Sequence, residues 1–121
     1  MYGKELILDL SECNLEKMTK ESIDTFLVDL CELIDMERVK VHYWTDEGID
    51  PVEYENNPHL QGVSVCQFIM TSSIVVHAIT GLKKVFINIF SCKNFSAEVA
   101  EGFAVAYFEG DKEHCIVLDR I

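Results

Sequence analysis

Basic residues are scarce in this chain, and their scarcity limits the partners that it can bind. The 121 residues include 10 lysines and arginines against 21 aspartates and glutamates, so the formal net charge is −11 at pH 7. A chain this acidic repels phosphate backbones and anionic lipid surfaces, so we expect neither nucleic acid nor a membrane as a partner. A small cationic ligand would be attracted instead.

Long apolar runs are also missing. No stretch approaches the roughly 20 apolar residues that a membrane-spanning helix needs. The N-terminus, Met1 to Glu5, lacks the basic-then-apolar order of a signal peptide. We therefore expect a cytoplasmic protein, and the length suits a single domain over residues 1–121.

Metal-binding and disulfide patterns are absent too. The 5 cysteines form no Cys-x-x-Cys pair, and their odd number argues against a disulfide framework. The 4 histidines share no ligand spacing on any one element. We expect no metal, and we expect most of the cysteines to be buried, which leaves one for chemistry.

Two stretches show helical periodicity. Apolar residues recur three and four positions apart from Ile23 to Ile34, and Thr19 is placed to cap the N-terminus of that helix. The same spacing recurs from Val99 to Phe108. Ser96 is the expected N-cap of this second helix, and Gly110 is the expected stop.

Six further stretches predict strands, because they alternate or are apolar almost throughout. They are Glu5–Leu10, Val39–Trp44, Gly62–Met70, Ser73–Ile79, Val85–Ser91 and His114–Leu118. The apolar run from Val85 to Phe90 predicts a central strand covered on both faces. Thr80–Leu82 predicts a tight hairpin, and the polar residues 45–59 predict a long loop.

The predicted order of elements is β-α-β-β-β-β-α-β, which favours an α+β fold. We expect a two-layer α/β sandwich, with two helices on one face of a mainly antiparallel six-stranded sheet. Apolar residues on the second face would then need another cover. An interface between two copies of the chain is the natural candidate, so we expect a homodimer.

Three short motifs lie in fixed register between residues 62 and 92. They are Gly62-Val63-Ser64, Thr71-Ser72-Ser73-Ile74-Val75-Val76-His77 and Asn88-Ile89-Phe90-Ser91-Cys92. Without a gap, they resemble the Gly-Val-Ser, Glu-Ser-His-x-x-x-His and Phe-Thr-Cys motifs of the prokaryotic S-adenosylmethionine decarboxylases. Leu10–Asn14 similarly resembles that family's Tyr-Glu-Cys-Asp. The resemblance extends over nearly the whole chain, but the identical residues are concentrated in these few positions. This pattern is typical of a divergent member of the family.

The resemblance implies a cofactor that the chain makes from itself. The Ser72 hydroxyl would attack the Thr71 carbonyl, and elimination and hydrolysis would turn Ser72 into a pyruvoyl group. That group would serve as an electron sink while S-adenosylmethionine loses CO₂ on the route to spermidine and other polyamines. Ser64 and His77 would assist processing, and Cys92 would protonate the carbanion.

The chain departs from the family pattern at three places. Thr71 stands where the family has Glu, and Gly81 stands where the family has an acidic residue that helps hold the ribose. Residues 56–61 replace aromatic residues that stack on adenine. The substrate could therefore be S-adenosylmethionine or a different amino acid. The aromatic residues that could replace the missing stacking contacts are Tyr43, Trp44 and Tyr54.

Other functions stay open at this point. The chain could be an unprocessed, catalytically inactive relative that serves as a binding or regulatory subunit. A purely structural domain with coincidental similarity would place Ser72, His77 and Cys92 far apart, whereas one active site requires them to converge. A thiol protease with Cys92 and His77 is disfavoured because no protease signature accompanies the pair.

Overall fold

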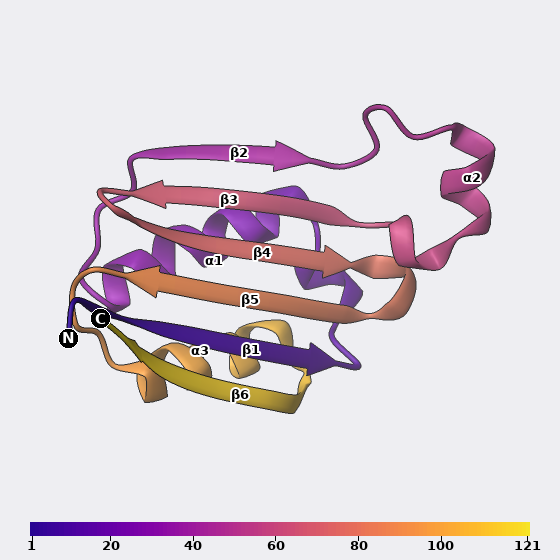
Figure 1. Ribbon diagram of the computed structural model, residues 1–121. Helices are drawn as coiled ribbons and strands as arrows, with labels where there is room; N and C mark the ends of the chain where they lie inside the picture. The colour runs from indigo at the N-terminus through magenta and orange to yellow at the C-terminus, as the bar shows by residue number, and fades with distance from the viewer.

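A single antiparallel sheet with helices on one face forms the molecule, shown in Figure 1 as a computed structural model of all 121 residues. The strand order is β2-β3-β4-β5-β1-β6, and every neighbouring pair is antiparallel. The strands are β1 (Gly3–Ser11), β2 (Lys40–Trp44), β3 (Val63–Ile69), β4 (Ser72–Ile79), β5 (Lys84–Ser91) and β6 (Asp111–Arg120). The predicted two-layer α+β fold is confirmed.

Helices α1 (Lys20–Leu33) and α3 (Ala97–Phe108) form the second layer. Both begin as predicted, because the Thr19 and Ser96 side chains accept hydrogen bonds from backbone N–H groups of the first turn. The end of α3 differs from the prediction. Glu109 takes the left-handed conformation (φ +53°) at the end of the helix, one residue before the glycine expected to stop it.

The core lies between the helices and the inner face of the sheet. Alternate residues of the central strands are buried there: Leu6, Leu8 and Leu10 of β1, Ile74, Val76 and Ala78 of β4, and Val85, Ile87 and Ile89 of β5. Phe26 of α1 contacts Phe108 of α3 at 4.8 Å between ring centroids. Each large side chain buried in this way stabilises the fold by about 1.5–3 kcal/mol.

The opposite side of the sheet, called the open face below, has no helix over it. It carries Ser64, Phe68, Val75, His77, Phe86, Phe90, Ile116 and Leu118. The prediction that β5 is covered on both faces is wrong within one chain, because Phe86 is 37% exposed while Ile87 is 3% exposed. Successive side chains of a strand point to opposite faces, so the apolar run of β5 serves two surfaces.

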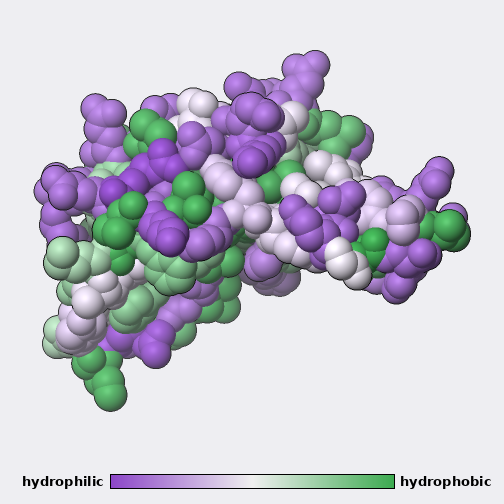
Figure 2. Space-filling view, turned by 90° about the horizontal axis from the view of Figure 1, so that it is seen from above, coloured by the Kyte–Doolittle hydropathy of each residue, from purple (hydrophilic) through white to green (hydrophobic).

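The segment predicted as a long loop contains structure of its own. A short helix, α2 (Pro51–Asn56), begins with an Asp50 cap and a proline in its first turn, and a 3₁₀ turn covers Pro58–Leu60. This segment projects beyond the sheet in Figure 1 and on the right in Figure 2, where hydrophilic residues cover much of it. The predicted hairpin at Thr80–Leu82 is a further 3₁₀ turn, followed by Lys83 at φ +54°.

No helix of the structure is long and apolar enough to cross a membrane.

A polar network joins α1 to strands β2 and β3. Arg38 donates from Nε to the Gln67 Oε1 at 2.5 Å and from a terminal nitrogen to Asp24 at 2.6 Å. The Tyr43 hydroxyl donates to the same carboxylate at 2.7 Å. These two partners, Tyr43 first, lower the pKa of Asp24. Gln67 is 1% exposed, and its amide nitrogen donates to two backbone carbonyls, so the whole side chain is paired inside the core.

We predict that Arg38→Leu lowers the free energy of unfolding by about 1–3 kcal/mol, because it leaves the Gln67 oxygen buried without a partner. Urea denaturation measures the change. Lys40→Ala is the matched control, since Lys40 is an exposed residue of β2, and its effect should stay within about 0.5 kcal/mol. Equal losses in the two variants would show that the network does not stabilise the fold.

Candidate active site

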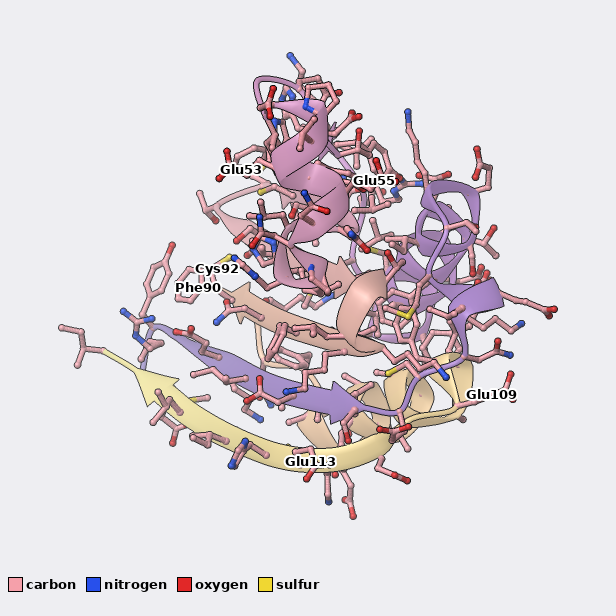
Figure 3. The ribbon with its side chains drawn as sticks, turned by 90° about the vertical axis from the view of Figure 1, so that its right-hand side faces the viewer. Glu53, Glu55, Phe90, Cys92, Glu109 and Glu113 are labelled. Atoms are coloured by element: carbon pink, nitrogen blue, oxygen red, sulfur yellow. The ribbon has the colours of Figure 1, made fainter.

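Ser72 and Cys92 meet at one end of the sheet. Ser72 is the first residue of β4, and Cys92 directly follows the neighbouring strand β5. The Cys92 N–H donates to the Ser72 Oγ at 3.0 Å, and the Ser72 Oγ lies 3.5 Å from the Cys92 Sγ. Figure 3 shows Cys92 beside Phe90, on the side of the sheet away from the helices. The structure thus brings together two of the four predicted site residues.

Thr71, the residue before Ser72, has a left-handed backbone (φ +53°). A β-branched residue rarely adopts this conformation, which costs about 1–3 kcal/mol. Its hydroxyl lies 2.7 Å from the Met70 carbonyl oxygen and 3.1 Å from the Cys92 Sγ. No sequence pattern predicts the contact between Thr71 and Cys92. It arises because the turn between β3 and β4 places residue 71 next to the end of β5.

The Cys92 thiol is partly exposed to solvent. Hydrogen bonds from the Thr71 hydroxyl and then the Ser72 hydroxyl hold the pKa of the Cys92 thiol below its usual value. A cavity of about 370 Å³ opens beside it, lined by residues 69–72, 91–93 and part of the connection from α1 to β2. The Lys93 ammonium closes one side by pairing with the Asp35 carboxylate at 2.8 Å.

Ser64 and His77 form a second group on the open face, toward the opposite end of β4 from Ser72. They stand opposite each other on β3 and β4, and the Ser64 Oγ lies 2.7 Å from the His77 Nδ1. A shallow pocket of about 210 Å³ surrounds them, with His42 and Trp44 of β2 in its wall. A hydroxyl hydrogen-bonded to an imidazole can move a proton or stabilise an oxyanion.

The four predicted residues therefore form two separate groups within one chain. Ser72 and His77 are five positions apart on β4, and an odd spacing points the two side chains to opposite faces. Five residues of strand also span about 16 Å. His77 is bonded to Ser64, and Cys92 to Thr71 and Ser72, so no Cys–His pair exists for a thiol protease.

The departures near the substrate region have a structural basis. A Cβ atom added to Gly81 would lie 2.3 Å from the Pro58 carbonyl oxygen, so an acidic side chain at position 81 would require the 3₁₀ turn at Pro58–Leu60 to move. Trp44 pairs with Ser64 and lies on the open face. Tyr43 turns the other way and bonds to Asp24 of α1. Of these two aromatic candidates, Trp44 alone is placed beside the Ser64–His77 pair.

No three His, Cys, Asp or Glu side chains converge in a way that could hold a metal ion.

Cys92 should be the most reactive of the cysteines, because the thiolate is the nucleophile and Cys92 is the cysteine whose pKa is lowered, in a partly exposed position. Burial raises the pKa of the Cys13 thiol to about 11 and also raises that of Cys31. We predict that iodoacetamide at pH 7 labels Cys92 at least about tenfold faster than Cys13, the factor that one pKa unit corresponds to.

Peptide mass spectrometry gives the rate at each cysteine. The same protein in urea is the control, and there the difference should vanish. Even labelling of the folded protein would contradict the geometry of the Cys92 site.

Comparison with known proteins identifies the family and the fold of this chain. A family model described as S-adenosylmethionine decarboxylase matches residues 4–121. Among solved structures, the fold is similar to that of the adenosylmethionine decarboxylase from Aquifex aeolicus VF5, with a TM-score of 0.78 and 15% identity over 98% of this chain and 90% of that chain. No curated protein matches the sequence significantly.

The family match extends over almost the entire sequence, which excludes a coincidental similarity of a few motif residues. The solved structure, at its low identity, adds agreement in fold alone. The chain belongs to the S-adenosylmethionine decarboxylase family.

Proposed function

We propose that this chain is a pyruvoyl-dependent decarboxylase that cuts itself between Thr71 and Ser72. The observation that carries the proposal is the 3.5 Å contact between the Ser72 hydroxyl and the partly exposed Cys92 thiol, at a serine that directly follows a residue with a strained backbone. Membership in a decarboxylase family supports this chemistry. The unprocessed, inactive relative remains the alternative, and the first experiment below separates the two.

The cut begins with the Ser72 oxygen. Its attack on the Thr71 carbonyl carbon forms a C–O bond, breaks the C–N bond and leaves an ester with a free amino group on residue 72. Removal of the Ser72 Hα then breaks the Cβ–Oγ bond, so that Thr71 keeps the oxygen as a carboxylate. Hydrolysis releases ammonia and completes the pyruvoyl group. The positive φ at Thr71 assists, because breaking the peptide bond releases the strain stored there.

The surrounding residues fit such a group. The reactive ketone carbon would be the former Cα of Ser72, and the Cys92 N–H already points at the Ser72 side chain at 3.0 Å. When present, the group supplies an electron sink for decarboxylation. The Cys92 Sγ is 3.5 Å from the Ser72 Oγ, so it is within reach to deliver a proton to the decarboxylated carbon.

A homodimer would reunite the two groups of site residues. In one chain the Ser64–His77 pair points out of the open face, away from Ser72. The open face also exposes large apolar side chains that one chain leaves uncovered: Phe68, Phe86, Ile116 and Leu118. We propose that two copies associate through their open faces, so that Ser64 and His77 of one copy reach the end of the other copy's sheet, where Cys92 contacts Ser72, and assist cleavage there.

The substrate we propose is S-adenosylmethionine or a related cationic amino acid. A net charge of −11 favours a sulfonium or ammonium cation. Since Gly81 lies against Pro58, the chain offers no carboxylate at position 81 to bind ribose hydroxyls. Selectivity for a nucleoside over a plain amino acid therefore depends on other contacts, with Trp44 as the aromatic surface nearest to Ser64 and His77.

Intact-mass measurement tests the cut. The 13.8 kDa chain should convert on incubation into two fragments, residues 1–71 and residues 72–121, the second carrying pyruvoyl in place of serine. Ser72→Ala should keep one full-length mass. Ser73→Ala is the matched control and should still be cut, because the Ser73 side chain points to the other face of β4. A wild-type chain that stays intact after prolonged incubation would exclude the decarboxylase and favour the inactive relative.

Mixing two inactive variants tests the shared site. Ser72→Ala and His77→Ala should each release almost no CO₂ from carboxyl-labelled S-adenosylmethionine. Equal co-expression should restore about a quarter of the wild-type rate, because half of random dimers are mixed and each has one complete site. Failure to restore activity, with mixed dimers demonstrated by mass, would place the whole site in one chain.

A further inference from the structure

The hydroxyl groups of Thr71 and Ser72 and the backbone N–H of Cys92 lie at the contact between Cys92 and Ser72. Each of these three groups has a single proton to donate. The Thr71 hydroxyl lies within bonding distance of both the Met70 carbonyl oxygen (2.7 Å) and the Cys92 Sγ (3.1 Å). With a thiolate, Thr71 donates to sulfur. With a neutral thiol, Thr71 donates to the carbonyl and accepts the S–H proton. Both protonation states of Cys92 therefore have a complete hydrogen-bond arrangement through Thr71.

Cleavage would change two of these groups at once. Ser72 would lose the hydroxyl that lies 3.5 Å from the sulfur. Thr71 would gain a carboxylate on its Cα, next to the Cβ that carries the hydroxyl, and that hydroxyl already reaches the sulfur. A hydrogen-bond donor is removed and a negative charge is added, and both changes favour the neutral thiol.

The other charged groups near Cys92 do not offset this change. Lys93 is next in sequence, but its ammonium is held by the Asp35 carboxylate and the Asp35 carbonyl oxygen. Glu37 in the cavity wall adds negative charge. The Tyr2 hydroxyl, from the chain terminus beside β1, favours the thiolate less strongly than Thr71 and Ser72 do. None of these groups is altered by the cut.

We propose that Thr71 is a positioning residue for Cys92, and that cleavage after Thr71 shifts Cys92 toward the neutral thiol, because the Ser72 hydroxyl is lost and a carboxylate is added at Thr71. The proposal rests on the proposed function, and it explains how one cysteine becomes a proton donor only once the site is mature. Before the cut, the Cys92 sulfur lies 3.5 Å from the Ser72 Oγ and, in its thiolate form, can accept the proton of the Ser72 hydroxyl. After the cut, the thiol holds the proton that the decarboxylated substrate needs.

The pH dependence of Cys92 alkylation tests both parts of the proposal. Iodoacetamide rates are measured from pH 5 to pH 10 and resolved by peptide mass spectrometry, with Cys115 as an internal reference far from the cut. Intact mass identifies which molecules are full length. In full-length protein, Thr71→Val should raise the midpoint for Cys92 by about 0.5–1 pH unit, because the hydroxyl is lost while the shape is kept. Thr71→Ser, which keeps the hydroxyl, should match the wild type.

The second comparison uses one preparation before and after cutting. In wild-type protein the Cys92 midpoint should be at least about one pH unit higher in cut molecules than in full-length molecules. An unchanged midpoint in Thr71→Val would refute the positioning role. A midpoint that stays equal or falls on cutting would refute the shift toward the neutral thiol.

The two proposals can fail separately. If no molecule is ever cut, the proposed function and the shift of Cys92 on cutting both fail, whereas the Thr71→Val comparison still decides the role of Thr71. If the chain is cut and releases CO₂ but neither midpoint moves, the decarboxylase stands and Thr71 has no influence on Cys92.

Discussion

The alternation of side chains along β4 determines how the site is divided. Even-numbered residues of β4 pack against α1 and α3, and this burial makes a slip of one residue in register energetically prohibitive. Ser72 therefore lies on the helix side at the start of the strand, while His77 lies on the open face. The hydrophobic layer thus determines more than stability, since it separates the Ser72 hydroxyl that would attack the peptide bond from the His77 imidazole that would assist the attack.

Much of the fold could be predicted from the sequence, because one periodicity dominates each element. The helix spacing from Ile23 to Ile34 matched α1, and the caps at Thr19 and Ser96 were correct. The sequence pattern is less informative for a strand whose apolar side chains lie on both faces of the sheet, and for a polar segment that forms a short helix. The apolar run of β5 predicts burial on both sides, and the polar residues around α2 predict a loop, although Asp50-Pro51 is a helix start.

The candidate site was predictable in its members but not in its arrangement. The motif register identifies Ser64, Ser72, His77 and Cys92, and strand parity alone would have shown that Ser72 and His77 point apart. The contact between Thr71 and Cys92 could not be foreseen, because it depends on a left-handed residue in a turn and on the end of a strand twenty residues away. The close packing of Gly81 on Pro58 likewise depends on tertiary structure.

The order of strands has a consequence for a chain divided after Thr71. Residues 1–71 would contain β1, β2 and β3, and residues 72–121 would contain β4, β5 and β6. In the sheet these pieces interleave, because β1 lies between β5 and β6 while β3 borders β4. Three ladders of backbone hydrogen bonds would join the two polypeptides across one continuous core. They would behave as one interlocked body, separable only by unfolding, so the scaffold around the cut would keep its shape.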